Sequence, residues 1–311
     1  MKLTMRSYQS EQDFWDIRNF LRGVCLLNDL HMFCWSVARL DYWRWHGIMN
    51  LDEGNLETGV YMWETEDRKI VAVVNQEGNG QVFLQIHPAY KTAKLEEEMI
   101  ALAEEKLRAP SRRGGQAMWI WSDAADSLRQ DILVGRGYTH ITEHDERQWR
   151  RDLNVAIPDK PIKDGYTLRA LGETSELASR CWASWKAFHS DEPDEKYDTD
   201  WSWYQNIQKA PLYRRDLDLV AIDTSGEVAA FTTIWYDDVT RCGYFEPVGC
   251  MPEHQRRGLA SSLLCEGMRR LKTMGAVQAE TAGGTPHANG LYQSILGPVY
   301  DISQPWEKRW P

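Results

Sequence analysis

Two pairs of segments in this chain match each other at the same spacing, and this repeat constrains the fold more than any other feature. Residues 3–17 (LTMRSYQSEQDFWDI) match 166–180 (YTLRALGETSELASR), and 128–133 (LRQDIL) match 291–296 (LYQSIL), both at an offset of 163 residues. A chain of 311 residues is long for one domain and sufficient for two of about 150. We therefore predict two similarly folded domains, 1–152 and 166–311, joined by a polar, proline-containing linker over 153–165.

The periodicity of each half predicts a strand, helical segments, a run of strands, a helix, and then strand, helix and strand. The helix expected over 259–274 places Leu264, Met268 and Leu271 on one face, and Gly275 stands where a helix stop is expected. This order predicts a mixed α/β (α+β) fold with a mainly antiparallel sheet. For the second half, the expected strands are 166–171, 217–223, 227–237, 241–251 and 276–281, and the other expected helices are 175–188 and 286–296.

The overall composition is that of an ordinary globular protein, with 42% hydrophobic and 26% charged residues. A formal net charge of −10 argues against a nucleic-acid surface and mildly favours a cationic small substrate. No segment approaches the ~18 consecutive apolar residues of a membrane helix, and the N-terminal sequence has no secretory apolar core. The six cysteines and eight histidines are scattered without metal-ligand spacing, so we expect reduced thiols, a cytoplasmic location and no metal site.

Residues 251–258 (MPEHQRRG) lie between a predicted strand and a predicted helix. The N-terminus of a helix leaves backbone N–H groups unpaired and carries partial positive charge. Gly258 allows a ligand to approach the backbone, and Arg256 and Arg257 add positive charge and hydrogen-bond donors. This combination predicts a phosphate or pyrophosphate site, although two arginines can also simply solvate a loop.

The segment Gln255–Ala260 (QRRGLA) resembles the Q/R-x-x-G-x-G/A signature of the GNAT N-acetyltransferase superfamily, with alanine in place of the final glycine. The resemblance covers 166–311, and the first half looks like the same fold without its motifs. It implies a tandem-GNAT protein with a degenerate N-terminal domain, each domain a mainly antiparallel twisted sheet flanked by helices. It also implies that the turn holds the pyrophosphate of acetyl-CoA, while the preceding strand splays and pairs with the pantetheine arm. The cofactor-binding residues so implied are Val248, Gly249, Cys250, Gln255, Arg256, Arg257, Gly258, Leu259, Ala260, Ser261 and Thr285.

Two residues are candidates for proton transfer. Tyr292 resembles the family tyrosine that protonates the coenzyme A thiolate, because Ala288, Leu291 and Tyr292 fit the pattern N-x-x-A-x-x-L-Y, with Thr285 at the asparagine position. Glu246 lies on the strand before the turn, where several members of the family place a catalytic base. The alternatives are a tyrosine that fills the core and a glutamate that has a structural role at a bulge.

The first half lacks these features. Aligned on Pro88 and Pro252, it places Lys94 opposite Gly258 and acidic residues, Glu96–Glu98, at the start of the helix, where they would repel a pyrophosphate. Arg129 stands at the position of Tyr292. We therefore expect no cofactor site there, and a role in supporting the fold, shaping the acceptor cleft or association.

The acceptor is expected over residues 181–213, which mix aromatic residues such as Trp201, Trp203 and Tyr204 with carboxylates such as Asp191 and Glu195. This combination suits a cationic amine, or forms only a solvated acidic loop ahead of a packed helix. The predicted function is direct acetyl transfer from acetyl-CoA to a primary amine of a small, cationic molecule. The alternatives are a CoA-binding regulatory module without turnover and an enzyme acting on a protein amine. A homodimer is possible, and neither nucleic acid nor membrane is an expected partner.

Overall fold

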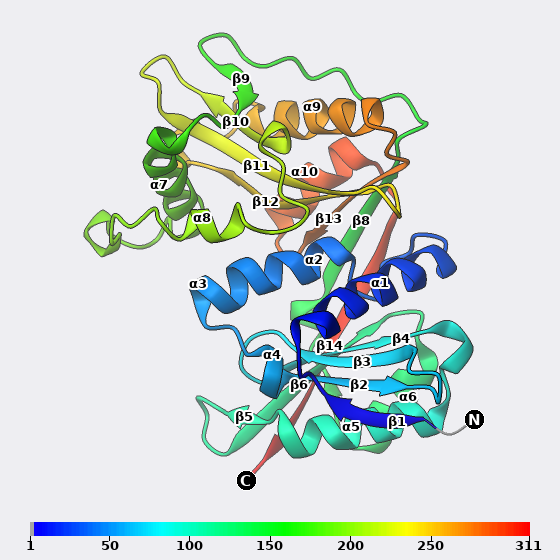
Figure 1. The fold of residues 1–311 in the computed structure, drawn as a ribbon. Coiled ribbons are helices and arrows are strands. Elements are labelled where there is room, and N and C mark those ends of the chain that lie inside the picture. Colours follow the sequence, from blue (N-terminus) through cyan, green and yellow to red (C-terminus); the bar gives the residue numbers. More distant parts are fainter. Residues whose placement is uncertain (1–2) are drawn as a thin grey trace. The chain divides into compact units, whose positions relative to one another are not determined.

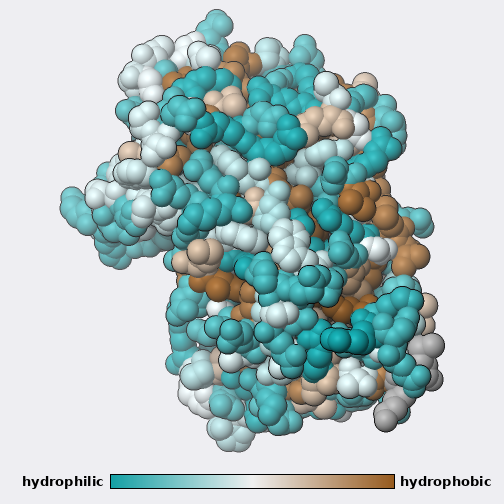
Figure 2. All heavy atoms as spheres, viewed as in Figure 1, coloured by the Kyte–Doolittle hydropathy of each residue, from teal (hydrophilic) through white to brown (hydrophobic). Residues whose placement is uncertain are grey.

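The computed structural model describes residues 3–311, which form two compact units (Figure 1). Unit 1 contains the chain up to Gln148 together with Asp301–Pro311, and unit 2 is Trp149–Tyr300. Among the described residues, no helix is long and apolar enough to cross a membrane. Most atoms visible in Figure 2 belong to hydrophilic residues, as the 26% of charged residues leads one to expect.

Unit 1 contains a sheet in the order β1-β2-β3-β4-β6-β14. The first four strands pair antiparallel, and β4 and β6 pair parallel. The strands are β1 (Thr4–Ser7), β2 (Val60–Glu64), β3 (Ile70–Gln76), β4 (Gln81–Ile86), β5 (Ala109–Pro110), β6 (Gln116–Asp123), β7 (Thr139–His140) and β14 (Tyr300–Trp310). The helices are α1 (Glu11–Leu27), α2 (Val37–Tyr42) with a π-helical continuation (Trp43–Ile48), α3 (Met49–Leu51), α4 (Leu56–Gly59), α5 (Ala93–Lys106) and α6 (Ser127–Gly135).

Unit 2 repeats this arrangement with a sheet in the order β9-β10-β11-β12-β13-β8. Again the first four strands pair antiparallel and β12 and β13 pair parallel. The strands are β8 (Glu146–Asp152), whose first three residues belong to unit 1, β9 (Thr167–Ala170), β10 (Asp218–Ile222), β11 (Val228–Asp237), β12 (Cys242–Cys250) and β13 (Gln278–Gly283). The helices are α7 (Leu177–Phe188), α8 (Tyr204–Ile207), α9 (Leu259–Thr273) and α10 (Pro286–Leu296).

The shared strand order confirms the mixed α/β fold with a mainly antiparallel sheet. It also explains the repeat, because the matched segments 3–17 and 166–180 form the first strand and helix of each unit. The strands and helices predicted for the second half are all present, with ends that differ by at most a few residues. Short 3-10 turns at Pro88–Tyr90 and Pro252–His254 stand at the two prolines used to align the halves.

The compact units differ from the predicted division of the sequence in two places. The last strand, β14, pairs antiparallel with β6 over eight residues, from Ser303 opposite Asp123 to Trp310 opposite Gln116, and so belongs to unit 1. Residues 153–165, expected as a linker, belong to unit 2, where the Pro161 carbonyl accepts a hydrogen bond from Ser262 of α9. Such long-range strand pairing leaves no local signal in the sequence. The boundaries of the repeat itself, 1–152 and 166–311, remain a prediction.

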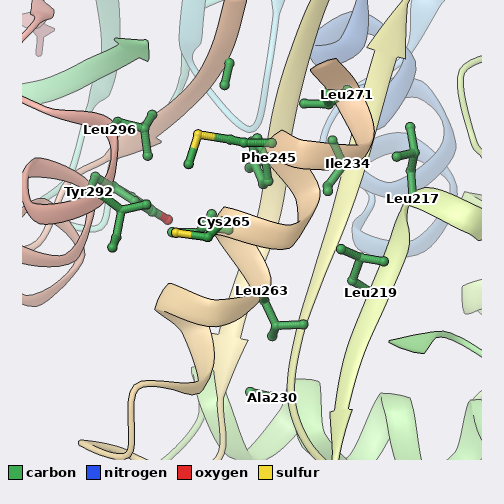
Figure 3. Close-up of a cluster of buried hydrophobic side chains, with 14 of the residues drawn as sticks. Leu217, Leu219, Ala230, Ile234, Phe245, Leu263, Cys265, Leu271, Tyr292 and Leu296 are labelled. Carbon is green, nitrogen blue, oxygen red and sulfur yellow. The ribbon is translucent and has the colours of Figure 1, made fainter. Parts of the chain in front are cut away.

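The core of unit 2 forms where α9 packs on β11 and β12. Leu264, Met268 and Leu271, the predicted apolar face of α9, are fully buried in one cluster with Phe245 and Ile234. Figure 3 shows Leu271 of α9 beside Phe245 and Ile234 of the sheet. At ~25 cal/mol per Å² of apolar area, each such side chain contributes about 1.5–3 kcal/mol. This packing fixes the start of α9 relative to the end of β12, which is the region of interest for function.

Candidate active site

Strands β12 and β13 separate after a short parallel contact. They pair only at Cys242–Gln278, Gly243–Ala279 and Tyr244–Glu280. From there to Cys250, β12 is paired with β11 on one side only. The end of β12 therefore has an open edge facing β13, as the family resemblance implied.

The hydrogen-bond register shows which backbone groups face this open edge. The Met251 N–H donates to the Ala229 carbonyl, so Gly249, which stands opposite Phe231, also exchanges its backbone bonds with β11. The groups of Val248 and Cys250 alternate with these and point away from β11. Consistently, the Cys250 carbonyl accepts a bond from the Gln255 side chain at 3.3 Å. The backbone groups of Val248 and Cys250 thus face the open edge, and those of Gly249 face β11.

Gly249 is required for another reason. A Cβ atom at this position would lie 2.2 Å from Cζ of Phe231, whose ring covers it from β11. The thiol of the neighbouring Cys250 has its pKa raised to about 11, mainly by burial and also by Glu253. A thiol that is protonated at neutral pH is a weak nucleophile, which supports a backbone role for Cys250.

The turn before α9 has the backbone of an anion site. Gly258 is the residue preceding the helix, with φ of 81°, and Arg256 also has positive φ, 61°. No side chain caps the N-terminus of α9, so the N–H groups of its first turn are left for another acceptor. A Cβ at Gly258 would meet nothing within 4 Å, which shows that the space before the helix is open. Gly258, Ala260 and Ser261 lie around this space, whereas the Leu259 side chain is buried in the core.

The two arginines of the turn differ in how they are held. Arg257 donates to the Tyr166 hydroxyl at 2.7 Å and to the Glu253 carbonyl at 2.9 Å. Tyr166 in turn contacts Nδ1 of His254 at 2.8 Å. Arg256 is exposed and has no side-chain partner among residues 3–311. One guanidinium is therefore positioned in advance, and the other is available to a ligand.

Glu246 and Tyr292 interact electrostatically where the strands separate. Burial and, to a lesser extent, the Glu246 charge raise the pKa of the Tyr292 hydroxyl well above its usual value of 10. Tyr292 forms a side-chain hydrogen bond with Thr281, whose hydroxyl donates to the Phe245 carbonyl at 3.0 Å. Figure 3 shows the Tyr292 ring pointing from α10 towards α9. Glu246 itself stands in a bulge of β12, where two of its residues face one residue of β11.

Thr285 has a structural task in this geometry. Its hydroxyl accepts a hydrogen bond from the Ala288 N–H at 3.2 Å and so caps α10. This accounts for a threonine at the position where the family pattern has asparagine. Its assignment as a cofactor ligand remains a prediction.

The corresponding helix start in unit 1 is capped, and its charged residues are paired within the chain. The Thr92 hydroxyl accepts from the Leu95 N–H and caps α5, in contrast to the uncapped α9. Glu96 is fully buried and its carboxylate contacts Arg129 at 3.0 Å. Arg129, which aligns with Tyr292, and Glu96, at the start of α5, therefore neutralise each other's charge.

The segment expected to bind the acceptor contains residues in two situations. Tyr204 is buried and donates to Asp218 at 2.8 Å, so it is a structural residue. His189 is stacked on Trp185 with centroids 4.1 Å apart, and its Nδ1 lies 3.0 Å from Glu192. Asp194 is paired with Lys186 at 2.7 Å. Part of the predicted negative charge is thus neutralised within the segment.

Sequence reasoning missed the contributions of Thr281, Tyr166 and His254. Thr281 lies near the end of the buried strand β13. A polar residue at such a position was the one signal in the sequence that could have indicated its role. Tyr166 and His254 are 88 residues apart, and only the fold brings them together.

Comparison with known proteins decides the family. The model of the acetyltransferase (GNAT) family matches residues 176–297, which include the uncapped helix, Glu246 and Tyr292. This chain contains a GNAT-family acetyltransferase domain over residues 176–297. A mycothiol acetyltransferase of Arthrobacter sp. (strain FB24) is 25% identical over 245 residues, 72% of this chain and 69% of that protein.

Solved structures of GNAT proteins share the fold over the whole chain. A GCN5-related N-acetyltransferase from Sphaerobacter thermophilus superposes with a TM-score of 0.67 at 15% identity, covering 99% of this chain and 95% of that one. A tandem GNAT protein from the clavulanic acid biosynthesis pathway gives 0.65 at 12% identity, covering 100% and 99%. The GNAT family uses acetyl-CoA as its acetyl donor, and the open turn before α9 is chemically suited to its pyrophosphate.

Proposed function

We propose that unit 2 transfers the acetyl group of acetyl-CoA directly to a primary amine of a small, cationic molecule. The observation that carries this proposal is the combination, in one unit, of an uncapped helix start with the nearby Glu246–Tyr292 pair. The first feature suits an anionic cofactor and the second suits proton transfer. A relative named for mycothiol, rather than for a protein, favours a small-molecule acceptor.

Binding of the cofactor would use the first-turn N–H groups of α9 together with Arg256 and Arg257 for the pyrophosphate. The backbone groups of Val248 and Cys250 would pair with the pantetheine arm along the open edge of β12, in the manner of an added strand. Gln255 holds the Cys250 carbonyl, so the Cys250 N–H is the group left for the thioester oxygen.

Proton transfer would use the two groups beside the open edge. Acetyl-CoA supplies an activated acetyl group, and the acceptor must lose a proton before its nitrogen can attack. Glu246 is proposed to take this proton, directly or through water, and Tyr292 to deliver one to the departing sulfur. A buried phenol with a raised pKa remains protonated at neutral pH, as a proton donor must.

A thiol-release assay tests the proposal. Purified protein is incubated with acetyl-CoA and, separately, with polyamines, aminoglycosides, amino sugars and peptides with free N-termini. Turnover with a cationic small amine and not with peptides is expected, and product mass must increase by one acetyl group. Preference for peptides would support the protein-amine alternative. Tight CoA binding without turnover on any acceptor would support the regulatory alternative.

A variant with Arg256→Ala and Arg257→Ala serves as the matched control, since it retains Glu246 and Tyr292. It should turn over the same acceptors with a raised KM for acetyl-CoA. An unchanged KM would mean that the pyrophosphate is held elsewhere.

A further inference from the structure

Unit 1 has a pocket of its own where its parallel strands separate. Strands β4 and β6 pair only at Gln81–Trp119 and Val82–Ile120, and diverge beyond these residues. Two adjoining cavities, of about 40 and 180 Å³, lie in this region. Both are lined by Phe33, Cys34, Asp123 and Arg129, so they form one continuous pocket.

Two residues that line the smaller cavity carry buried polar atoms that have no partner. Trp35 and Gln148 line it, and their exposed fractions are only 5% and 3%. The Trp35 indole Nε1 and the Gln148 Oε1 are buried and lack a hydrogen-bond partner among the described residues. A buried polar atom without a partner costs roughly 1–3 kcal/mol. These two residues of the cavity lining therefore carry one unsatisfied donor and one unsatisfied acceptor.

Asp123 supplies an uncompensated negative charge to both cavities. One of its carboxylate oxygens accepts the Ala125 N–H at 2.7 Å. No lysine, arginine or histidine among residues 3–311 lies within ion-pair distance of it. Burial, followed by the charges of Asp301 and Asp126, raises its pKa, and the Ala125 N–H and the more distant His31 offset this only in part. A cation placed in the pocket would relieve this unfavourable arrangement.

The positive side chains of the pocket are already neutralised. Arg129 is bound to Glu96 by two nitrogens and to the Trp121 carbonyl by the third. Lys91 is paired with Asp126. These cations therefore offer little to an anionic ligand.

The remaining cation, Arg39, is also accounted for. It is paired with Glu77 at 2.5 Å, and its guanidinium lies 4.8 Å from the Trp35 ring centroid and 4.7 Å from that of Phe83. These rings are occupied by a cation of the chain itself. A ligand ammonium is accordingly expected beside Asp123 and not over these two rings.

We propose that the pocket of unit 1 binds a small primary amine that also carries a hydroxyl group, with its ammonium on Asp123 and its hydroxyl between the Trp35 Nε1 and the Gln148 Oε1. A hydroxyl both accepts and donates, so it satisfies the two unpaired atoms together. The two cavities, of about 40 and 180 Å³, leave room for a small organic molecule. This proposal is independent of acetyl transfer in unit 2.

Three probes of similar size test the charge of the ligand: glycerol, serinol, in which an ammonium replaces the central hydroxyl of glycerol, and glycerate, in which a carboxylate replaces one terminal CH2OH group. Binding to the full-length protein is measured by saturation-transfer NMR and calorimetry. Serinol is expected to bind about tenfold more tightly than glycerol, equivalent to ~1.4 kcal/mol, and glycerate more weakly still. Glycerate binding as tightly as serinol would overturn the proposal, and so would absence of serinol binding.

Variants locate the site within the chain. Asp123→Asn should weaken serinol binding about tenfold and leave glycerol unaffected. Asp131→Asn, the same change at an exposed position of α6 outside the pocket, should bind as wild type. Trp35→Phe removes the unpaired N–H together with part of the indole ring, and it should weaken serinol and glycerol alike. If Asp123→Asn and Trp35→Phe, each shown to be folded by circular dichroism, both bind serinol normally, the site lies elsewhere and the proposal is wrong.

Discussion

Arg169 donates to Glu176 at 2.6 Å and 2.9 Å, and this pair joins the first strand of unit 2 to the turn that precedes α7. The Gly172 N–H donates to the same carboxylate at 2.8 Å. In unit 1, Arg6 and Asp13 form the equivalent pair at 2.7 Å, and the Gln9 N–H donates to Asp13. Both pairs occupy matching positions of the repeat, so the repeated sequence encodes a repeated ion pair.

This pair predicts a pH dependence of stability. The hydrogen bond from Arg169 lowers the pKa of Glu176. A lowered carboxyl pKa stabilises the folded state above the unfolded value, about 4.3, and this stabilisation is lost as pH falls through the lowered pKa. Glu176→Gln should therefore reduce the free energy of unfolding at pH 7, with a smaller difference from wild type at pH 3. Denaturant titrations at both pH values measure this, with Glu195→Gln as the exposed control. An equal difference at both pH values would contradict the assignment.

The repeat shows how much the sequence could predict. Short segments that keep Thr, Arg and an acid at fixed spacing were visible because they serve the same local contact twice. The pairing of β14 with β6 could not be predicted from the sequence, because it joins residues about 190 positions apart. Periodicity therefore predicted the helices and strands. Which of them belong to each unit is known only from the structure.

The Glu96–Arg129 pair predicts a large effect on the stability of unit 1. Glu96 is fully buried and Arg129 is 5% exposed, so removal of one partner leaves a buried charge. Arg129→Met should destabilise the protein by about 3–5 kcal/mol. The double variant with Glu96→Gln should lose less than the sum of the single changes. Urea unfolding of the wild type, the two single variants and the double variant completes a double-mutant cycle. Additive losses in the free energy of unfolding would argue against a coupled pair.

The hydroxyl of Tyr292 is expected to matter for turnover and not for binding. Tyr292→Phe removes the proton donor while keeping the buried ring, so kcat should fall by about 10²–10⁴. The affinity for CoA, measured by calorimetry, should stay the same. Tyr236→Phe, which removes the hydroxyl that donates to Met274, is the control and should retain activity. Unchanged turnover in Tyr292→Phe would leave the tyrosine with a packing role only.

Arg256 should contribute to cofactor affinity through its charge. Because it has no partner within the described chain, Arg256→Ala removes an interaction with the ligand and leaves the folded protein undisturbed. CoA affinity should fall about tenfold, and its dependence on salt concentration should become weaker. Lys272→Ala, at the other end of α9, is the matched control. Equal effects of the two substitutions would indicate only a change in net charge.

Close packing of Gly249 against Phe231 predicts that the effects of substitutions at these two positions on stability depend on each other. A Cβ atom there would lie 2.2 Å from the Phe231 ring, so Gly249→Ala should destabilise the protein by about 1–3 kcal/mol. Addition of Phe231→Leu should recover part of this loss, since the smaller side chain leaves room for the methyl group. Thermal unfolding of the single and double variants measures the recovery. A double variant less stable than either single one would show that the contact is not the cause.

At the candidate site, the sequence predicted which residues are present better than it predicted what each of them does. The QRRGLA turn and Tyr292 were visible as patterns, and the fold brings Tyr292 near Glu246. The caps were not visible: Thr285 and Thr92 each bind the N–H three residues ahead, and only the structure shows that α9 lacks such a cap. Differences between Val248, Gly249 and Cys250 likewise depend on register, which sequence patterns do not specify.

A crystal structure with acetyl-CoA bound tests the central proposal most directly. The account predicts one cofactor, with its pyrophosphate on the N–H groups that follow Gly258 and its thioester between Glu246 and Tyr292. Cofactor density at the start of α5 beside Thr92, or an empty turn before α9 at saturating acetyl-CoA, would contradict it.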